Sequence, residues 1–254
     1  MKIEYYLMNP TGNITLIAVN PVDENFQLET AAKLMKLEPS AEQVGFLTGN
    51  RLRMAGGEFC GNASMSAAVL LCRDLKSGDS RKTELEVSGT DEKISVDITA
   101  EEDGCKGTVT MPKPLSLEDI VLSFDGEDYS TAAVRFSGIT HLVFSADFDR
   151  NTAEKAAPEW CRQLNADALG IMIFDEEKSE LMPLVYVPNA GTMFWESSCA
   201  SGTSAVGAYL YRKEKRPVKL TLSEQGGKLT VETDGEKLLL SGSVKIIKHS
   251  QVDI

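Results

Sequence analysis

The chain carries one order of sequence elements twice within its 254 residues. Each half begins with a β-rich segment broken by a turn, and continues with an amphipathic helical stretch and further strand-like segments. A small-residue turn that holds a cysteine then leads into an apolar helix and a closing run of alternating strands. The period is too long for a solenoid, so we interpret the pattern as a duplicated domain.

The two apolar helices follow closely on cysteines, Cys60 in the first half and Cys199 in the second. We expect these helices over residues 62–75 and 201–212. Both are apolar on nearly all sides, which is typical of a helix enclosed by protein and not of one that lies on a surface. The sequence therefore predicts a cysteine at the start of one buried helix in each half.

The last strands of each half alternate with a period of two and are separated by glycine-containing turns. We therefore expect an α+β fold of two pseudo-symmetric domains, each a curved, mostly antiparallel sheet wrapped around one central helix. A proline-containing linker, residues 112–114, separates the halves. Two lobes are predicted, one over residues 1–114 and one over residues 115–242, and the last strand, residues 243–254, is a candidate to complete the N-terminal lobe.

Charge and hydropathy exclude several classes of protein. The net charge is −12 and the isoelectric point is near 4.8. Nucleic-acid binding needs clustered lysine and arginine, so neither nucleic acid nor an anionic membrane surface is an expected partner. The first residues lack the apolar core of a signal peptide, and no apolar run approaches the roughly 18–20 residues that cross a bilayer. We expect a cytoplasmic protein.

The cysteine pattern indicates reduced thiols. The chain has five cysteines, an odd number, and no CxxC pair, which does not suggest a disulfide scaffold. It has two histidines, so a zinc site would need an unusual ligand set, and we expect no metal. The remaining thiols are interpreted as small core residues; they are Cys72, Cys105 and Cys161.

A cysteine at a helix start is suited to proton transfer. Unpaired backbone N–H groups and the helix macrodipole favour thiolate over thiol, and the same groups form a site for a carboxylate. Two similar lobes packed face to face would bring Cys60 and Cys199 to opposite sides of one cleft. A thiolate on one face of an amino-acid Cα and a thiol on the other could invert its configuration, and the two would titrate as a coupled pair.

Two motifs resemble those of a known superfamily. The string Cys60-Gly61-Asn62, preceded by Glu58, and the string that begins at Cys199 are similar to the two signatures of the diaminopimelate epimerase and proline racemase superfamily. The resemblance spans nearly the whole chain. It implies an isomerase that is independent of pyridoxal phosphate, of any other cofactor and of metal, with Cys60 and Cys199 as its two catalytic bases.

The resemblance also implies substrate-binding residues. Asn13 looks like the family asparagine that borders the substrate, and Gly61 and Asn62 fall where backbone and side chain contact it. His141 matches a histidine near the catalytic pair, and Glu196 matches a glutamate that orients the site. The residues after the second cysteine would hold the substrate carboxylate through backbone N–H groups; these are Ala200, Ser201, Gly202 and Thr203.

The departures from the family pattern bear on the substrate. Diaminopimelate epimerases recognise the far end of their substrate with asparagines and a Glu-Arg pair, and this chain lacks that arginine at residues 186–189. A site without these partners rejects such a substrate strongly. The strings around Cys60 and Cys199 look closer to the histidine racemase branch, and Phe59, Phe194 and Trp195 could shape an aromatic pocket.

The leading hypothesis is racemisation of a free amino acid, with histidine as the best single guess. Diaminopimelate epimerisation is the alternative within the same class. Alternatives of other classes are a thiol redox or sensor protein and a non-catalytic amino-acid-binding protein. The expected partner is a small amino acid, and a homodimer is left open.

Overall fold

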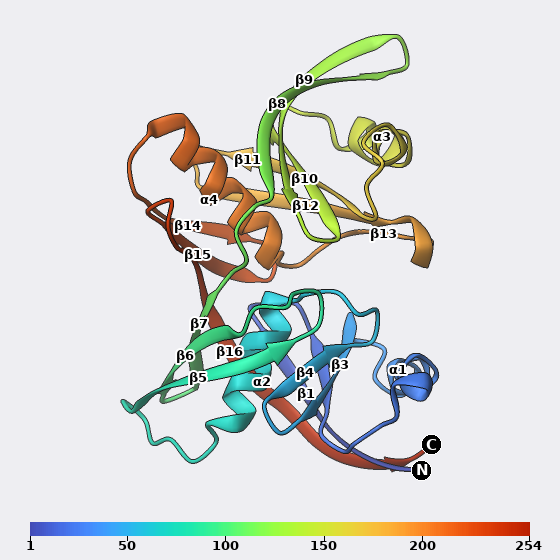
Figure 1. Cartoon of the computed structure of the whole chain (residues 1–254), viewed down its shortest axis with the longest axis vertical. Coiled ribbons are helices and arrows are strands. Elements are labelled where there is room, and N and C mark those ends of the chain that lie inside the picture. The colour runs from blue at the N-terminus through green and yellow to red at the C-terminus, as the bar shows by residue number, and fades with distance from the viewer. The chain divides into compact units, whose positions relative to one another are not determined.

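A computed structural model gives the structure of the chain and describes residues 1–189 and 191–254. The chain forms two compact units (Figure 1). Unit 1 comprises residues Met1–Thr110 and Leu240–Ile254, and unit 2 comprises Met111–Leu239. Over the described residues, no helix is both long enough and apolar enough to span a membrane.

Strands dominate the secondary structure. The described part of the chain contains sixteen strands, four α-helices and one short 3-10 helix, which makes the protein more strand-rich than the predicted α+β class implied. The four α-helices span only 11 to 15 residues each, and most of the remaining chain pairs into strands.

Unit 1 is a closed barrel. Its strands are hydrogen-bonded in the order β1-β2-β3-β4-β5-β6-β7-β16, and β1 also pairs with β16, which closes the sheet. Pairs β2–β3 and β4–β5 are parallel. The strands are β1 (Lys2–Pro10), β2 (Thr15–Ala18), β3 (Gln43–Thr48), β4 (Arg51–Met54), β5 (Ser80–Val87), β6 (Ile94–Glu101), β7 (Gly104–Thr110) and β16 (Leu238–Asp253).

The helix α2 (Gly61–Leu71) is the core of unit 1. Every residue from Gly61 to Leu70 is buried, and the helix contacts β1, β2 and β4 to β7. The wall of the barrel comes so close that a Cβ at Gly107 of β7 would lie 3.0 Å from the Met65 side chain. A second helix, α1 (Glu24–Leu37), contacts β3 and buries one face, which includes Ala31 and Leu34.

The helix α2 ends earlier than the predicted residue 75. Cys72 is its C-cap, and the N–H of Cys72 is shared between the carbonyls of Ala68 and Val69. Such sharing tightens the last turn toward 3-10 geometry and ends the regular helix. The second predicted helix, over residues 201–212, is slightly longer in the structure, where α4 spans Ala200–Glu214.

Unit 2 is an open sheet with its own helices. Its strand order is β15-β14-β12-β11-β10-β9-β8, and β13 pairs with β12. The strands are β8 (Ser116–Phe124), β9 (Glu127–Phe136), β10 (Ile139–Ser145), β11 (Leu169–Asp175), β12 (Glu180–Val187), β13 (Thr192–Trp195), β14 (Val218–Glu224) and β15 (Gly227–Thr233). The helices are α3 (Arg150–Gln163), the 3-10 helix η1 (Pro188–Ala190) and α4.

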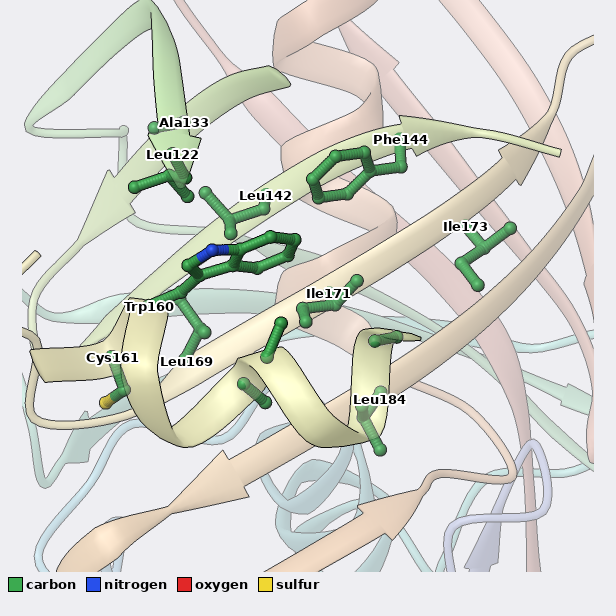
Figure 2. Packing of buried hydrophobic residues seen from close by; sticks show 13 residues of the cluster. Leu122, Ala133, Leu142, Phe144, Trp160, Cys161, Leu169, Ile171, Ile173 and Leu184 are labelled. Carbon is green, nitrogen blue, oxygen red and sulfur yellow. The ribbon is translucent and has the colours of Figure 1, made fainter. Parts of the chain in front are cut away.

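Trp160 of α3 is the centre of one hydrophobic cluster of unit 2 (Figure 2). Its ring is fully buried and stacks on Phe144, with ring centroids 5.5 Å apart. The indole N–H donates to the carbonyl of Ser123 at 3.2 Å, so the polar atom of the ring is satisfied. The other long helix of unit 2, α4, contacts β9, β10, β11, β14 and β15.

Candidate active site

Cys60 is the N-cap of α2. Its backbone is extended, with φ −134° and ψ 114°, so the helix begins at the next residue, Gly61. The Cys60 sulfur accepts the N–H of Ala63 at 3.4 Å, and the Cys60 carbonyl accepts both the N–H and the hydroxyl of Ser64. The side chain is half-buried. The thiol therefore lies where unpaired backbone donors of a helix start are concentrated.

The loop before Cys60 is held by the turn between β5 and β6. Gly89 has φ +79°, and a Cβ there would lie 2.1 Å from the backbone nitrogen of Phe59. Any other residue at Gly89 would push the turn off the cysteine loop. Ser88 completes the attachment, since its hydroxyl donates to the Glu58 carbonyl at 2.7 Å and accepts the N–H of Met54 at 2.9 Å.

Asn62 and Asn13 occupy different surroundings in unit 1. Asn62, the second residue of α2, is buried, and its carbonyl accepts the Ser66 hydroxyl at 3.0 Å. Asn13 follows β1 and is also buried; its amide donates to Glu42 at 2.8 Å and accepts from Gln43. Asn13 thus belongs to an amide–carboxylate network at the start of β2.

Cys199 is the N-cap of α4 and is 4% exposed. Its N–H donates to Oε2 of Glu224 at 2.8 Å, and its carbonyl accepts the N–H of Thr203 at 2.9 Å. The Thr203 hydroxyl donates to the second carboxylate oxygen of Glu224, Oε1, at 2.6 Å. The helix start and the strand β14 are therefore joined through one buried carboxyl group.

The surroundings of Cys199 oppose ionisation of its thiol. Burial raises the pKa of Cys199 well above its usual value, and Glu196 adds to this through its charge and a hydrogen bond. The charge of Glu224 acts in the same direction, whereas the backbone N–H of Gly202 lowers the pKa. Burial likewise raises the pKa of Glu224 to about 8, against two hydrogen bonds that lower it. The Cys199 thiol and the carboxyl groups of Glu196 and Glu224 therefore disfavour one another's ionisation, because little water screens their charges.

Gly202 leaves room for the sulfur of Cys199. A Cβ at this position would lie 3.2 Å from the Cys199 sulfur and 2.2 Å from the sulfur of Met172. The second contact is far inside van der Waals distance. A glycine at the third position of α4 therefore lets β11 and the catalytic candidate pack closely against the helix.

His141 of β10 is fully buried and reaches the first turn of α4. Its Nε2 lies 2.9 Å from the hydroxyl oxygen of Ser201, which in turn lies 3.7 Å from the Cys199 sulfur. Burial lowers the pKa of His141 to about 3, so its imidazole is neutral near pH 7. A Cβ at Gly170 would lie 2.0 Å from Nδ1 of His141, which means that glycine makes the space for the ring.

The predicted site residues therefore fall into two sets. Unit 1 contains Cys60, Gly61, Asn62 and, in its own network, Asn13. Unit 2 contains the second set around α4; its members are His141, Glu196, Cys199, Ala200, Ser201, Gly202 and Thr203. Ala200 is the first residue of α4, and its carbonyl accepts the Ser204 hydroxyl at 2.8 Å. In each set a cysteine is the N-cap of a buried helix. Polar side chains surround Cys199, the cysteine of unit 2.

Comparison with known proteins decides the family. The family model of the histidine racemase CntK N-terminal domain matches residues 2–252. A histidine racemase of Fusobacterium nucleatum subsp. nucleatum is 34% identical over 263 residues, and the alignment covers 99% of this chain and 97% of that protein. The chain belongs to the histidine racemase family. It is an isomerase, of the amino-acid racemase type.

Solved structures share the fold of this histidine racemase family member. A predicted epimerase from Pseudomonas aeruginosa superposes with a TM-score of 0.72 at 13% identity, over 99% of both chains. A hydroxyproline epimerase from Agrobacterium vitis, solved with bound trans-4-hydroxy-L-proline, has a TM-score of 0.68 at 13% identity and covers 99% of this chain and 92% of its own. These structures show the shared fold, whereas the family model and the curated relative confirm the histidine racemase branch that the cysteine motifs resemble.

Glu224 is a residue of this family member that the sequence analysis missed. It is the last residue of β14 and precedes Gln225-Gly226, where a glutamate is usually an exposed residue at the edge of a turn. One signal was present: the alternation of β14 buries Val218 and Leu222, and the same period of two places Glu224 on that inward face. A carboxylate at a core-facing position indicates a buried partner, which here is the start of α4.

Proposed function

We propose that the chain racemises a free amino acid, histidine in the first place, by moving a proton at Cα between the thiols of Cys60 and Cys199. The observation that carries the proposal is that each cysteine N-caps a buried helix of its own unit. No pyridoxal phosphate and no metal enter this mechanism. The relatives named as histidine racemases support the choice of substrate.

The helix starts supply the chemistry that this reaction needs. Removing the Cα proton of an amino acid builds negative charge next to its carboxylate, and the barrier falls when fixed donors stabilise that charge. Backbone N–H groups of the first turns of α2 and α4 are donors of this kind. One cysteine as thiolate accepts the proton and the other as thiol delivers one, so the mechanism requires the two sulfurs to reach opposite faces of one Cα.

Matching connections support a duplicated, two-lobed architecture as part of the proposal. In unit 1, β2 and β3 are parallel and joined through α1; in unit 2, β10 and β11 are parallel and joined through α3. The segments β4–α2–β5 and β12–α4–β14 likewise connect parallel neighbours. We propose that the lobes predicted over residues 1–114 and 115–242 descend from one such unit.

The choice of histidine as substrate rests partly on the residues that would recognise a distal carboxylate. Residues 186–189 offer no arginine for a distal carboxylate, which disfavours diaminopimelate. Cysteine chemistry of this kind also needs reduced thiols, which fits a cytoplasmic enzyme. Histidine, an amino acid with a neutral, aromatic side chain near pH 7, satisfies these conditions.

Proton exchange tests the function directly. The protein is incubated in D2O with single L-amino acids and with diaminopimelate, and Cα deuterium and the D-isomer are measured by NMR and chiral chromatography. Histidine should gain deuterium at Cα and appear as the D-isomer. Cys60→Ser and Cys199→Ser should each abolish racemisation, whereas Cys105→Ser, which removes a thiol outside both helix starts, should retain it.

The same panel separates the alternatives. Exchange with diaminopimelate and none with histidine would establish an epimerase with a remodelled far-end site. Ligand binding that survives both serine variants, without any exchange in the wild-type protein, would identify a binding protein. A reversible disulfide between the two cysteines, again without exchange, would identify a redox protein. Each of these three results would overturn the proposal.

A further inference from the structure

Glu224 attaches the turn between β14 and β15 to the start of α4. Its carboxylate accepts the N–H of Cys199 at 2.8 Å and the hydroxyl of Thr203 at 2.6 Å. Two residues later, the N–H of Gly226 donates to the carbonyl of Ser197 at 2.7 Å. The backbone on both sides of the Cys199 thiol is therefore fixed by this one turn.

The start of α4 is a place that stabilises one negative charge. Its unpaired N–H groups and the helix macrodipole attract an anion. Two buried groups compete for that position, the sulfur of Cys199 and the carboxylate of Glu224, and the half-buried Glu196 also opposes ionisation of the thiol. Both are nearly enclosed, at 4% and 8% exposure, so water screens their mutual repulsion poorly. Like charges at such sites disfavour each other, and the two groups titrate as a coupled pair.

We propose that Glu224 is a positioning residue for Cys199: its carboxyl group fixes the Cys199 backbone, and its negative charge, once the group ionises, keeps Cys199 in the thiol form. One negative charge, and not two, then resides at the start of α4 after Glu224 has lost its proton. The catalytic meaning rests on the proposed function, because a thiol at Cys199 matters when Cys199 delivers a proton to Cα. The charge competition itself is a property of unit 2.

The surroundings of Glu224 allow its protonation state to follow the solution. Glu224 lines a pocket of about 270 Å³ in unit 2 together with Glu180, Trp195 and Glu196. Burial raises the pKa of Glu224 to about 8, and it raises the pKa of Cys199 further. Both groups thus change charge on the alkaline side of neutrality, where thiol reactivity can be measured without acid unfolding.

Site-resolved alkylation tests the proposal on the full-length protein. Iodoacetamide is applied from pH 6 to pH 11, and the alkylated peptide containing Cys199 is quantified by mass spectrometry, because the thiolate is the reactive form. The pH midpoint of Cys199 alkylation is compared between wild type and variant. Limited access to the buried thiol lowers the rate equally at every pH and so does not move the midpoint. Glu224→Gln keeps an acceptor for the Cys199 N–H and removes the charge. The alkylation midpoint of Cys199 should fall by about one pH unit, which corresponds to roughly tenfold faster alkylation at a pH above the pKa of Glu224 and below both midpoints.

Two controls accompany this variant. Glu180→Gln removes a charge from the same pocket without a contact to Cys199 and should leave the midpoint within about 0.3 units of wild type. Cys60, quantified in the same samples, should not respond to Glu224→Gln. A Cys199 midpoint that stays at the wild-type value in Glu224→Gln, or that shifts equally in Glu180→Gln, would overturn the proposal.

A second variant keeps the test decisive if Glu224→Gln does not fold. Glu224→Ala removes the same charge without placing an amide in the buried site. The Cys199 midpoint should fall in the same direction as in Glu224→Gln; an unchanged midpoint counts against the proposal. Racemase activity is measured in parallel. A shifted midpoint in a protein without any Cα exchange would refute the proposed function and leave the charge competition standing.

Discussion

The imidazole of His141 and the hydroxyl of Ser201, sixty positions apart in the sequence, lie within 2.9 Å of each other in unit 2. The contact joins β10 to the first turn of α4, next to the sulfur of Cys199. Since His141 is fully buried and neutral, this hydroxyl is the polar partner that the structure provides for its Nε2.

Ser201→Ala should therefore destabilise the protein. Nε2 of His141 would lose its partner inside the protein, at a cost of about 1–3 kcal/mol for a buried polar group. The change is measured as a lower urea midpoint. Ser80→Ala, which removes an exposed hydroxyl that bonds Thr99, is the matched control and should shift stability by less than about 0.5 kcal/mol. Equal midpoints for both variants would contradict the role assigned to Ser201.

The stability of Glu224→Gln should depend on pH differently from that of the wild type. The pKa of Glu224 is raised from 4.5 to about 8, so the folded state holds a proton between these values that the unfolded state releases. Wild-type stability is lost through this group as pH rises from about 4.5 to 8. The variant lacks that loss.

We therefore expect Glu224→Gln to gain stability relative to wild type between pH 5 and pH 8, on the order of 1–3 kcal/mol. Urea midpoints at the two pH values measure the gain. A constant difference between the proteins at both pH values would show that Glu224 does not titrate in this range.

Gly202→Ala should overpack the contact between α4 and β11. The new methyl group would lie 2.2 Å from the Met172 sulfur, and overpacking of this kind costs about 1–3 kcal/mol. A double-mutant cycle with Met172→Ala checks the cause. The double variant should be less destabilised than the sum of the single variants, because the smaller residue removes the clash. Additive effects would place the strain elsewhere, for example at the Cys199 sulfur.

Trp160→Phe should weaken the core of unit 2. The change removes ring volume from a fully buried position and leaves the Ser123 carbonyl without the indole N–H. We expect a loss of about 1–3 kcal/mol, measured by chemical unfolding followed through circular dichroism. Trp195→Phe is the comparison, because Trp195 is only half-buried and its N–H bonds to the exposed residue Glu154; its loss should be smaller.

Local patterns predicted the positions of Cys60 and Cys199, because a small-residue turn followed by an apolar run marks the start of a buried helix in the sequence itself. The motifs also indicated the histidine racemase family, which the comparisons confirm. They did not predict the role of Glu224 or the partner of His141. Those contacts depend on which strands become neighbours, and a sequence period says which face a residue occupies without saying what lies opposite.

Helix boundaries show the same limit. The helix after Cys60 is predicted to reach residue 75, yet α2 ends at Leu71, before the charged residues Arg73 and Asp74. Apolar periodicity indicates burial, whereas the end of a helix depends on how its last carbonyls find partners. The shared hydrogen bond of the Cys72 N–H is a three-dimensional feature that no composition or spacing encodes.

The strand β16 has a consequence for how the protein is made. It leaves unit 2 at Leu239 and pairs antiparallel with β1, as in Ile3 with Val252 and Met8 with Ile246, with one register shift between Leu7 and Met8. The ribosome synthesises β1 first and β16 last, so the barrel of unit 1 stays open between β1 and β7 until the final residues are made. A chain that terminated before β16 would therefore leave this barrel unclosed, although its other strands were synthesised first.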